Sequence, residues 1–142
     1  MKNALDLLND KGAHVYSIEP DATVLEALHL MAEHEVGALP VLDGDRLVGI
    51  VTERDYARKV MLFERSSRTT QVREIMMKRV ACVEPTRSVE ECMALMTDKR
   101  VRHLPVMRDG RMIGLVSIGD LVKAIIDEQK FIISQLELYI AS

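Results

Sequence analysis

The apolar residues of the chain follow two patterns, one typical of helices and one typical of strands. Apolar positions recur at helical spacing in Val24–Met31 and again in Val89–Met96. Each of these segments is followed by two short apolar runs that flank a polar turn containing glycine, Asp43-Gly44-Asp45 in one case and Arg108-Asp109-Gly110 in the other. Turns of this composition favour a β-hairpin. The pattern therefore predicts a helix and then a hairpin, twice.

The residues around these segments complete the predicted unit. Thr23 and Glu26, like Ser88 and Glu91, have the spacing of a capping box at a helix start. A second helix is predicted after each hairpin, and a short β-like run that ends at a proline precedes each unit. We therefore expect the order β-α-β-β-α in both copies, with the first strands at His14–Ile18 and Val80–Val83 and the last helices after Thr52 and Ser117.

The two units are copies of one another. Pro20–Val60 aligns without a gap with Pro85–Ile125, and identical pairs include Pro40 with Pro105, Gly49 with Gly114 and Asp55 with Asp120. A sequence repeat of this kind is the signature of a repeated supersecondary unit. The fold class predicted is α/β (α+β), with two repeats packed with pseudo-twofold symmetry so that their apolar faces close on each other.

The predicted domain boundaries follow from this repeat. Residues 1–63 form repeat 1 with an N-terminal helix, residues 64–71 a polar connector, residues 72–127 repeat 2, and residues 128–142 an extension of the C-terminal helix. Short helices are expected at Asn3–Asn9, leading into the first copy, and at Val72–Lys78, leading into the second.

The C-terminal segment is more apolar than one buried face requires. Ile118–Ile140 is predicted to be one helix about 35 Å long. Apolar side chains lie on a stripe and on other faces as well, which favours burial against a second chain. Folding back onto its own core is the alternative, and a membrane-surface helix is disfavoured by acidic residues on the polar face. The stripe consists of Leu121, Ile125, Ile132, Leu136 and Tyr139, and the other apolar residues are Phe131, Ile133, Leu138 and Ile140.

Composition and charge exclude several classes of protein. The 142 residues carry a formal net charge of −3 and contain no tryptophan and 4% aromatic residues, which disfavours broad binding to nucleic acid. The chain has no apolar run long enough for a transmembrane helix and no pattern of a signal peptide at its start. Cys82 and Cys92 have no CxxC or zinc-ligand spacing, so we expect two buried thiols, no metal requirement and a cytoplasmic protein.

The repeated motif resembles a known family. Gly37-Ala-Leu-Pro-Val41 with Gly49-Ile-Val-Thr-Glu-Arg-Asp55, and Arg102-His-Leu-Pro-Val106 with Gly114-Leu-Val-Ser-Ile-Gly-Asp120, resemble the cystathionine-β-synthase (CBS) domain. Two such domains in tandem form a Bateman module, and this chain resembles a stand-alone CBS-pair protein. The resemblance implies a regulatory protein that binds adenine ligands in clefts between the two repeats.

The hydroxyl and carboxylate that end each motif have two interpretations. The resemblance implies that Asp55 and Asp120 contact a ribose and that Thr52 and Ser117 lie near the ribose or phosphate. Carboxylates commonly accept hydrogen bonds from a ribose diol, and a helix start suits a phosphate. The same spacing also satisfies a capping box with a shortened acid. The two roles are compatible.

The dipeptide before Leu-Pro-Val distinguishes the copies. Basic residues at this place meet phosphates in members of the family, so Arg102 and His103 are phosphate candidates, with a solvated basic run as the alternative reading. Gly37 and Ala38 cannot bind an anion through their side chains. We therefore hypothesise two unlike sites, one with room for a dinucleotide. The full candidate set is Ser17, Ile18, Val36, Gly37, Ala38, Leu39, Pro40, Thr52, Arg54 and Asp55 in copy one, and Cys82, Val83, Val101, Arg102, His103, Leu104, Pro105, Ser117 and Asp120 in copy two.

The function predicted is a regulatory sensor in signal transduction. The expected ligand is AMP or NAD, with ATP or S-adenosylmethionine also compatible, and the expected partners are a second copy in a homodimer and an unknown downstream protein. A nucleotide-processing enzyme is disfavoured because no nucleophile–base pair or metal cluster is visible, so no catalytic residue is assigned. A structural scaffold with vestigial pockets is the remaining alternative.

Overall fold

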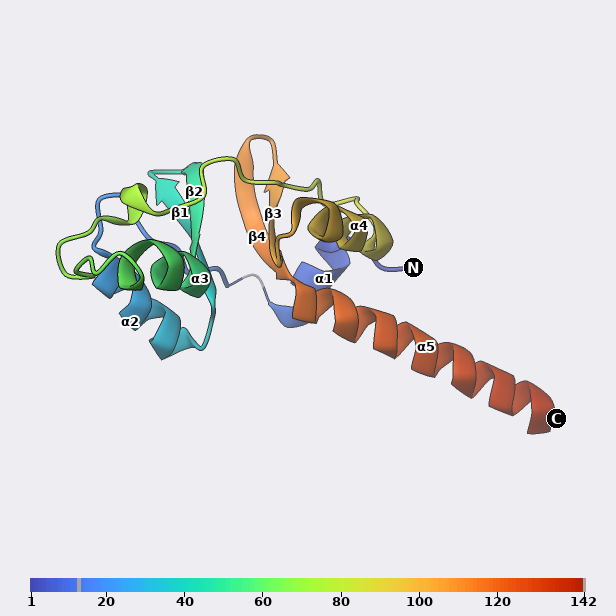
Figure 1. Ribbon diagram of the computed structural model, residues 1–142. Helices are drawn as coiled ribbons and strands as arrows, with labels where there is room; N and C mark the ends of the chain where they lie inside the picture. Colours follow the sequence, from blue (N-terminus) through green and yellow to red (C-terminus); the bar gives the residue numbers. More distant parts are fainter. Residues whose placement is uncertain (13, 142) are drawn as a thin grey trace. The chain divides into compact units, whose positions relative to one another are not determined.

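The structure of the protein is a computed structural model that describes residues 1–12 and 14–141. Helices and hairpins alternate along the chain in the order predicted from the repeat (Figure 1). In sequence order the elements are α1 (Ala4–Lys11), α2 (Val24–His34), β1 (Ala38–Asp43), β2 (Arg46–Thr52), α3 (Glu53–Tyr56), η1 (Ala57–Met61), η2 (Val72–Glu74), α4 (Val89–Lys99), β3 (His103–Arg108), β4 (Arg111–Ser117) and α5 (Ile118–Ala141).

Each repeat contains a two-stranded antiparallel hairpin, as predicted. β1 pairs with β2, with Ala38 opposite Thr52 and an irregularity after Val41, and β3 pairs with β4. The tight turns place Gly44 at φ 63° and Gly110 at φ 77°, a region that glycine enters without a steric penalty. The glycine in each polar turn therefore allows the hairpin to close.

The run before each first helix is shorter than the strand that the sequence predicts. In the first repeat only Ile18 forms a bridge, parallel to Val41 of β1, and in the second only Val83 does so, with Val106 of β3. The Ile18 N–H donates to the Pro40 carbonyl at 3.1 Å, and the Leu42 N–H donates to the Ile18 carbonyl at 2.9 Å. A proline two residues further on lacks an N–H and ends the pairing.

Helices α2 and α4 begin at the capping boxes that the sequence predicts. The Thr23 hydroxyl accepts the Glu26 N–H and the Ser88 hydroxyl accepts the Glu91 N–H, both at 3.1 Å, while each glutamate side chain accepts the amide of its cap. Such a cap contributes about 1 kcal/mol to helix stability. The two helix starts are therefore determined by neighbouring residues alone.

The chain divides into two compact units that do not follow sequence order. The first-repeat unit holds residues 14–80 and 108–113, and the second-repeat unit holds the described residues of 1–13, 81–107 and 114–142. Helix α1 therefore packs with the second repeat, although it precedes the first. The segment 72–78, which we expected to lead into the second repeat as a helix, packs with the first and is helical only over η2.

Backbone hydrogen bonds hold both exchanged segments in place. The Ala4 N–H donates to the Arg87 carbonyl at 2.8 Å, and the Val72 N–H donates to the Ala22 carbonyl at 2.8 Å. Each segment starts at its own capping box, with Asn3 at one and Gln71 at the other. The two segments are thus equivalent, but each packs with the other repeat than the one into which it was expected to lead.

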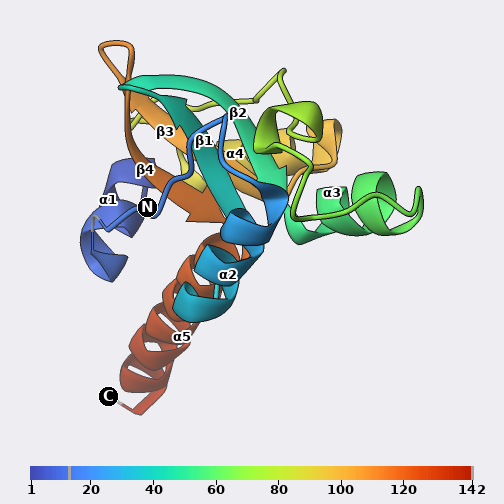
Figure 2. The ribbon, with the colours of Figure 1, turned by 90° about the vertical axis from the view of Figure 1, so that its left-hand side faces the viewer.

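The polar connector is also part of the first-repeat unit. The Ser67 carbonyl accepts the Leu25 N–H at 2.9 Å, and the Thr70 carbonyl accepts the Val24 N–H at 2.8 Å. Thr70 is buried, and its hydroxyl donates to the Ser66 carbonyl at 2.7 Å. Residues 64–71 therefore pack against the first turn of α2, which lies beside the β1–β2 hairpin in Figure 2.

The cysteines differ in burial. Cys92 is buried in α4, as expected, and burial raises the pKa of its thiol. Cys82 is exposed, contrary to the expectation. In extended backbone, neighbouring side chains point to opposite sides. Since Val83 is buried, Cys82 faces the other way.

Candidate functional site

In the first repeat, the end of β2 and the start of α3 form a closed polar corner. The Thr52 hydroxyl accepts the Asp55 N–H at 3.1 Å, and Asp55 Oδ2 accepts both the Thr52 N–H and the Thr52 hydroxyl at 3.0 Å. Lys59, one turn further along, lies 3.4 Å from Asp55 Oδ1. The capping role is thus present, and both oxygens of this carboxylate have partners.

The second repeat has the same corner with a different cation. The Ser117 hydroxyl accepts the Asp120 N–H at 3.2 Å, and Asp120 Oδ2 accepts the Ser117 N–H at 2.8 Å. Lys11, from α1, donates its ammonium to Asp120 Oδ2 and to the Leu115 carbonyl, both at 2.6 Å. Burial raises the pKa of Asp120, but the hydrogen bonds from Lys11 and the Ser117 amide outweigh burial and lower it. This carboxylate is therefore held in its charged form.

The first residue of the dipeptide before Leu-Pro-Val is joined to the corner in both repeats. The Glu53 N–H donates to the Gly37 carbonyl at 3.1 Å, and the Ile118 N–H donates to the Arg102 carbonyl at 2.9 Å. These bonds connect the start of the first hairpin strand to the first turn of the following helix. The structure therefore brings the predicted dipeptide and the predicted hydroxyl–carboxylate pair together within each repeat.

The basic pair in the second repeat consists of two unlike groups. Arg102 is exposed, whereas His103 is half-buried. Burial lowers the pKa of His103, and the nearby charge of Lys11 lowers it further. At neutral pH this imidazole is therefore neutral, with one donor and one acceptor rather than a full positive charge.

The predicted apolar contacts fall into three groups by burial. Leu39 and Leu104 are 0% exposed, so their side chains belong to the cores of their units. These two side chains are therefore inaccessible to a ligand. The remaining candidates are buried at Ala38, Pro40, Val83 and Pro105, half-buried at Ile18, Val36, Gly37 and Val101, and exposed at Ser17, Arg54 and Cys82.

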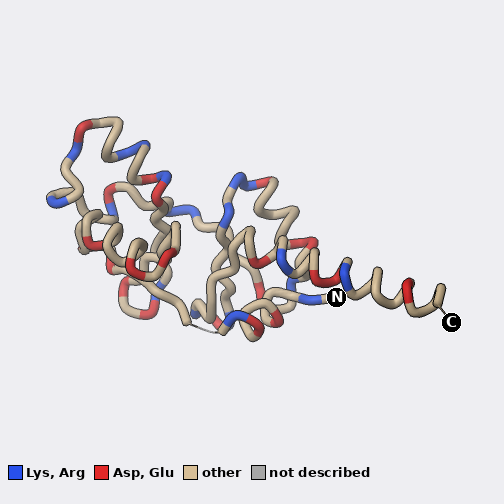
Figure 3. The backbone as a smooth tube through the Cα atoms, turned by 90° about the horizontal axis from the view of Figure 1, so that it is seen from below, with Lys and Arg blue, Asp and Glu red and all other residues tan. Residues whose placement is uncertain are grey.

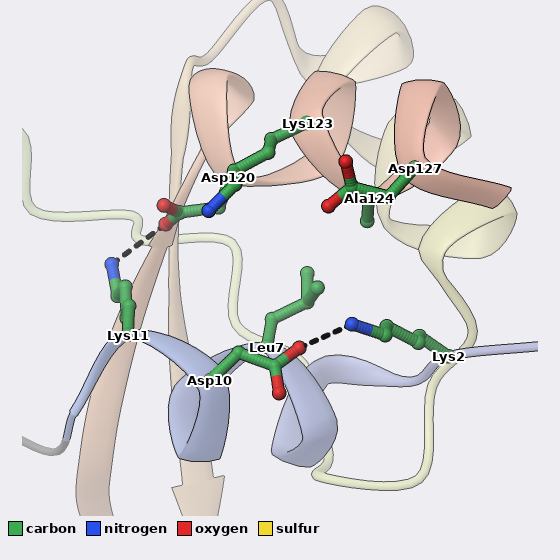
Figure 4. A pocket seen from close by; sticks show the side chains of 8 residues that line it. All are labelled: Lys2, Leu7, Asp10, Lys11, Asp120, Lys123, Ala124 and Asp127. Carbon is green, nitrogen blue, oxygen red and sulfur yellow. Dashed lines mark hydrogen bonds and ion pairs between the residues drawn. The ribbon is translucent and has the colours of Figure 1, made fainter. Parts of the chain in front are cut away.

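A shallow pocket lies beside the second corner, between α1 and the first turns of α5 (Figure 4). Lys11 and Asp120 meet at one end of it, and Lys2 pairs with Asp10 at 2.5 Å at the other. The pocket is lined by Lys2, Leu7, Asp10, Lys11, Asp120, Lys123, Ala124 and Asp127. It therefore combines three lysines and three aspartates with two apolar residues.

The sequence reasoning missed both lysines that pair with the predicted carboxylates. Lys59 lies four residues after Asp55, a spacing at which opposite charges meet on a helix, so the sequence contained a signal for it. Lys11 is far from Asp120 in sequence, and only the packing of α1 with the second repeat brings them together. No local pattern indicates that pair.

The described residues also bear on metal and membrane binding. Within residues 1–12 and 14–141, no three His, Cys, Asp or Glu side chains lie close enough together to hold a metal ion. None of the helices in that part of the chain combines the length and hydropathy that crossing a bilayer requires.

Comparison with known proteins identifies the repeat. The family model for the CBS domain matches residues 4–62 and again residues 72–127. The chain belongs to the CBS-domain family. Stand-alone CBS-pair proteins of this size are among its structural neighbours, and such proteins are commonly regulatory and bind nucleotides.

Three relatives show how widely this architecture occurs. The mitochondrial CBS domain-containing protein CBSX3 of Arabidopsis thaliana is 45% identical over 84% of this chain, which spans 61% of the length of that relative. A structure of a CBS-domain protein from Burkholderia ambifaria MC40-6 is 53% identical with a TM-score of 0.86, covering 90% of this chain and 96% of that one. Hypoxic Response Protein I, solved with two coordinated zinc ions, is 30% identical with a TM-score of 0.74, covering 87% of this chain and 99% of that one.

Proposed function

We propose that this CBS pair is a regulatory protein that binds an adenine nucleotide, AMP or NAD in the first place, at the ends of β2 and β4. The observation that carries the proposal is the repeated corner. In each repeat a hydroxyl and a carboxylate are fixed at a helix start, and one backbone hydrogen bond joins that helix start to the first residue of the dipeptide before Leu-Pro-Val. Such a corner presents a fixed carboxylate whose remaining lone pairs can accept hydrogen bonds from a ribose diol.

The two corners differ in charge, which supports unlike sites. Each carboxylate has a lysine beside it, Lys11 at Asp120 and Lys59 at Asp55, but the dipeptide before Leu-Pro-Val is Arg102-His103 in the second repeat and Gly37-Ala38 in the first. The second corner is therefore the better place for a phosphate. The first has room for a larger group, since an added Cβ at Gly37 would meet its nearest neighbour, Glu53, only at 3.8 Å.

Thermal unfolding of protein stripped of nucleotide tests the proposal against AMP, ADP, ATP, NAD, NADH and S-adenosylmethionine. A ligand at about 100 times its dissociation constant stabilises by roughly 2.7 kcal/mol, a shift of several degrees for a chain of this size. We expect Asp55→Asn or Asp120→Asn to remove the shift for the site concerned. Asp43→Asn, in an exposed position at the end of β1, is the matched control and should retain it.

The alternative functions predict different outcomes. A scaffold with vestigial pockets shows no shift with any adenine ligand, and this result contradicts the proposal. An enzyme converts the ligand, which chromatography of NAD or ATP after incubation detects. A shift that both aspartate variants retain also contradicts the assigned site.

We further propose that α5 pairs with α5 of a second copy of this chain. Its first turns are held in the second-repeat unit by Leu121 and Ala124, which are buried, but its C-terminal half extends beyond the other elements of that unit (Figure 1). The fold-back alternative therefore does not hold for this half. Few charges interrupt it, as Figure 3 shows.

The exposed residues of α5 have the spacing of a coiled-coil seam. Val122, Ile126, Gln129, Ile133, Leu136 and Ile140 follow a heptad. In this register isoleucine takes the a positions and leucine one d position, the combination that favours two-stranded pairing. Ile126 is 44% exposed, Ile133 54%, Leu136 55% and Ile140 81%. This seam supports a homodimer. We place the protein in the cytoplasm, where a downstream protein would bind its liganded and ligand-free forms differently.

A further inference from the structure

Lys11 approaches the second corner from outside the repeat motif. Its ammonium lies 2.6 Å from Asp120 Oδ2, the ion pair drawn in Figure 4, and 2.6 Å from the Leu115 carbonyl. It therefore joins the end of β4 to the first turn of α5. An ammonium has three donors, and these two bonds use two of them. The side chain of Lys11 is 37% exposed, so the group remains accessible from solvent.

The backbone beneath Lys11 is fixed. Two hydrogen bonds hold the start of helix α1. The Ala4 N–H donates to the Arg87 carbonyl at 2.8 Å, and the Leu5 N–H donates to the Pro85 carbonyl at 3.0 Å. Lys11 is in the last turn of that helix. The ammonium is therefore positioned by a helix whose first turn is hydrogen-bonded to the second repeat. In the first repeat the cation on Asp55 is Lys59, from η1, which directly follows α3.

The charges around Asp120 are unlike those around Asp55. Lys11 and Arg102 are both close enough to His103 to influence its protonation, and Asp120 is as well. Lys11 thus influences both Asp120 and His103. Since Asp120 Oδ2 already accepts bonds from Lys11 and the Ser117 N–H, a ribose diol would share this carboxylate with the ammonium.

We propose that Lys11 is the residue by which the second repeat selects a 5′-phosphorylated adenosine over adenosine itself. This role rests on the proposed function and follows from distance and charge. The Lys11 side chain is flexible, four carbons long and already paired with Asp120. If the ribose of a nucleoside binds Asp120, its 5′ substituent therefore lies within reach of the Lys11 ammonium. A phosphate oxygen takes the third ammonium donor, and a neutral 5′-hydroxyl gains much less from it.

Calorimetric titration of the full chain, stripped of nucleotide, with AMP and with adenosine tests this assignment. In Lys11→Met we expect AMP binding to weaken by about tenfold or more, the value of one lost charge-assisted hydrogen bond. Adenosine binding should change less than about twofold, and Lys11→Arg should recover most of the AMP affinity. The matched control is Arg79→Met, in the segment that packs with the first repeat, and it should leave both affinities unchanged. Arg79 lies eight residues after the cap Gln71, as Lys11 lies eight residues after the cap Asn3.

The outcomes separate this inference from the proposed function. If Lys11→Met weakens AMP and adenosine equally, Lys11 has a structural role only and the inference is overturned. It is also overturned if AMP affinity is unchanged, or if AMP binding is lost in Asp55→Asn and retained in Asp120→Asn, because the ligand then uses the first repeat. If the wild-type chain binds neither compound, the proposed AMP site itself fails and the selectivity fails with it. Circular dichroism of each variant shows whether α1 remains folded.

Discussion

The exchange of α1 into the second-repeat unit makes a sharp prediction at Gly114. A Cβ built on Gly114 would lie 2.5 Å and 2.6 Å from the two methyl carbons of Leu8 and 3.0 Å from its Cγ. Leu8 is 3% exposed, so its side chain cannot move into solvent to relieve the overlap. Gly114→Ala should therefore overpack this interface.

The magnitude follows from known costs of overpacking. An extra methyl group in a packed core costs about 1–3 kcal/mol, or roughly 3 °C in melting temperature per kcal/mol at this chain length. Leu8→Ala alone leaves a cavity and costs about 2–5 kcal/mol. In the double variant the new Cβ enters the space that the leucine leaves. We therefore expect the double variant to be no less stable than Leu8→Ala, with a favourable coupling of about 1–3 kcal/mol.

The assay is a double-mutant cycle measured by urea unfolding with circular dichroism. Gly49→Ala with Leu8→Ala supplies the matched control, because Gly49 occupies the equivalent position in the first repeat. There the nearest neighbours of an added Cβ come from the segment 72–78: it would lie 2.6 Å from Met76 Sδ and 2.9 Å from the Met77 carbonyl oxygen. Separate sites of this kind add within about 0.3–0.5 kcal/mol.

Two results would refute the reasoning. Additive effects of Leu8→Ala and Gly114→Ala would show that these residues do not touch. Coupling of Leu8→Ala to Gly49→Ala instead would place α1 in the first repeat, as the order of the sequence suggests.

Three further predictions concern charge and assembly. Lys11 and the Ser117 amide outweigh burial and lower the pKa of Asp120. This carboxylate therefore contributes stability that is present above its unfolded pKa of about 4 and is lost as the pH falls through the lowered value. In urea titrations Asp120→Asn should be less stable than wild type at pH 7, and a stability difference that persists at pH 2 would contradict this. Burial lowers the pKa of His103, so the unfolded chain binds a proton at this imidazole more readily than the folded chain does, and stability falls as the pH drops through about 6.5. Between about pH 7 and pH 5, His103→Gln should therefore lose less stability than wild type. Equal losses would mean that this histidine is not the group responsible. Ile133→Asp should convert the α5-paired dimer to monomer in analytical ultracentrifugation, whereas Glu137→Asp should not, and a wild-type chain that sediments as a monomer at every concentration tested would exclude the pairing.

What the sequence alone determined is local or repeated. The capping boxes at Thr23 and Ser88 were readable because a cap involves residues three positions apart. The hairpins were readable because glycine in the turn and apolar residues on both sides are all that a short antiparallel pair needs. The two Ser/Thr–Asp corners were readable for the same reason, and the alignment of the repeats then indicated the family.

What only the tertiary structure decided involves partners far apart in the chain. Gly49 and Gly114 are equivalent, and so are the short segments led by Asn3 and Gln71, so local chemistry allows either segment to pack on either repeat. Only the complete set of packing contacts determines that Leu8 meets Gly114 and that Met76 meets Gly49. The pairing of Lys11 with Asp120 follows from that choice.

Burial was likewise decided by the assembled units. Leu39 and Leu104 lie in the motif that predicts a ligand site, but closure of each core takes their side chains out of reach. Cys82 is exposed because Val83 takes the inward position. The first turns of α5 are buried in their unit and its later turns are exposed. The sequence pattern shows which faces of a helix are apolar, but it does not show how far the core extends to cover them.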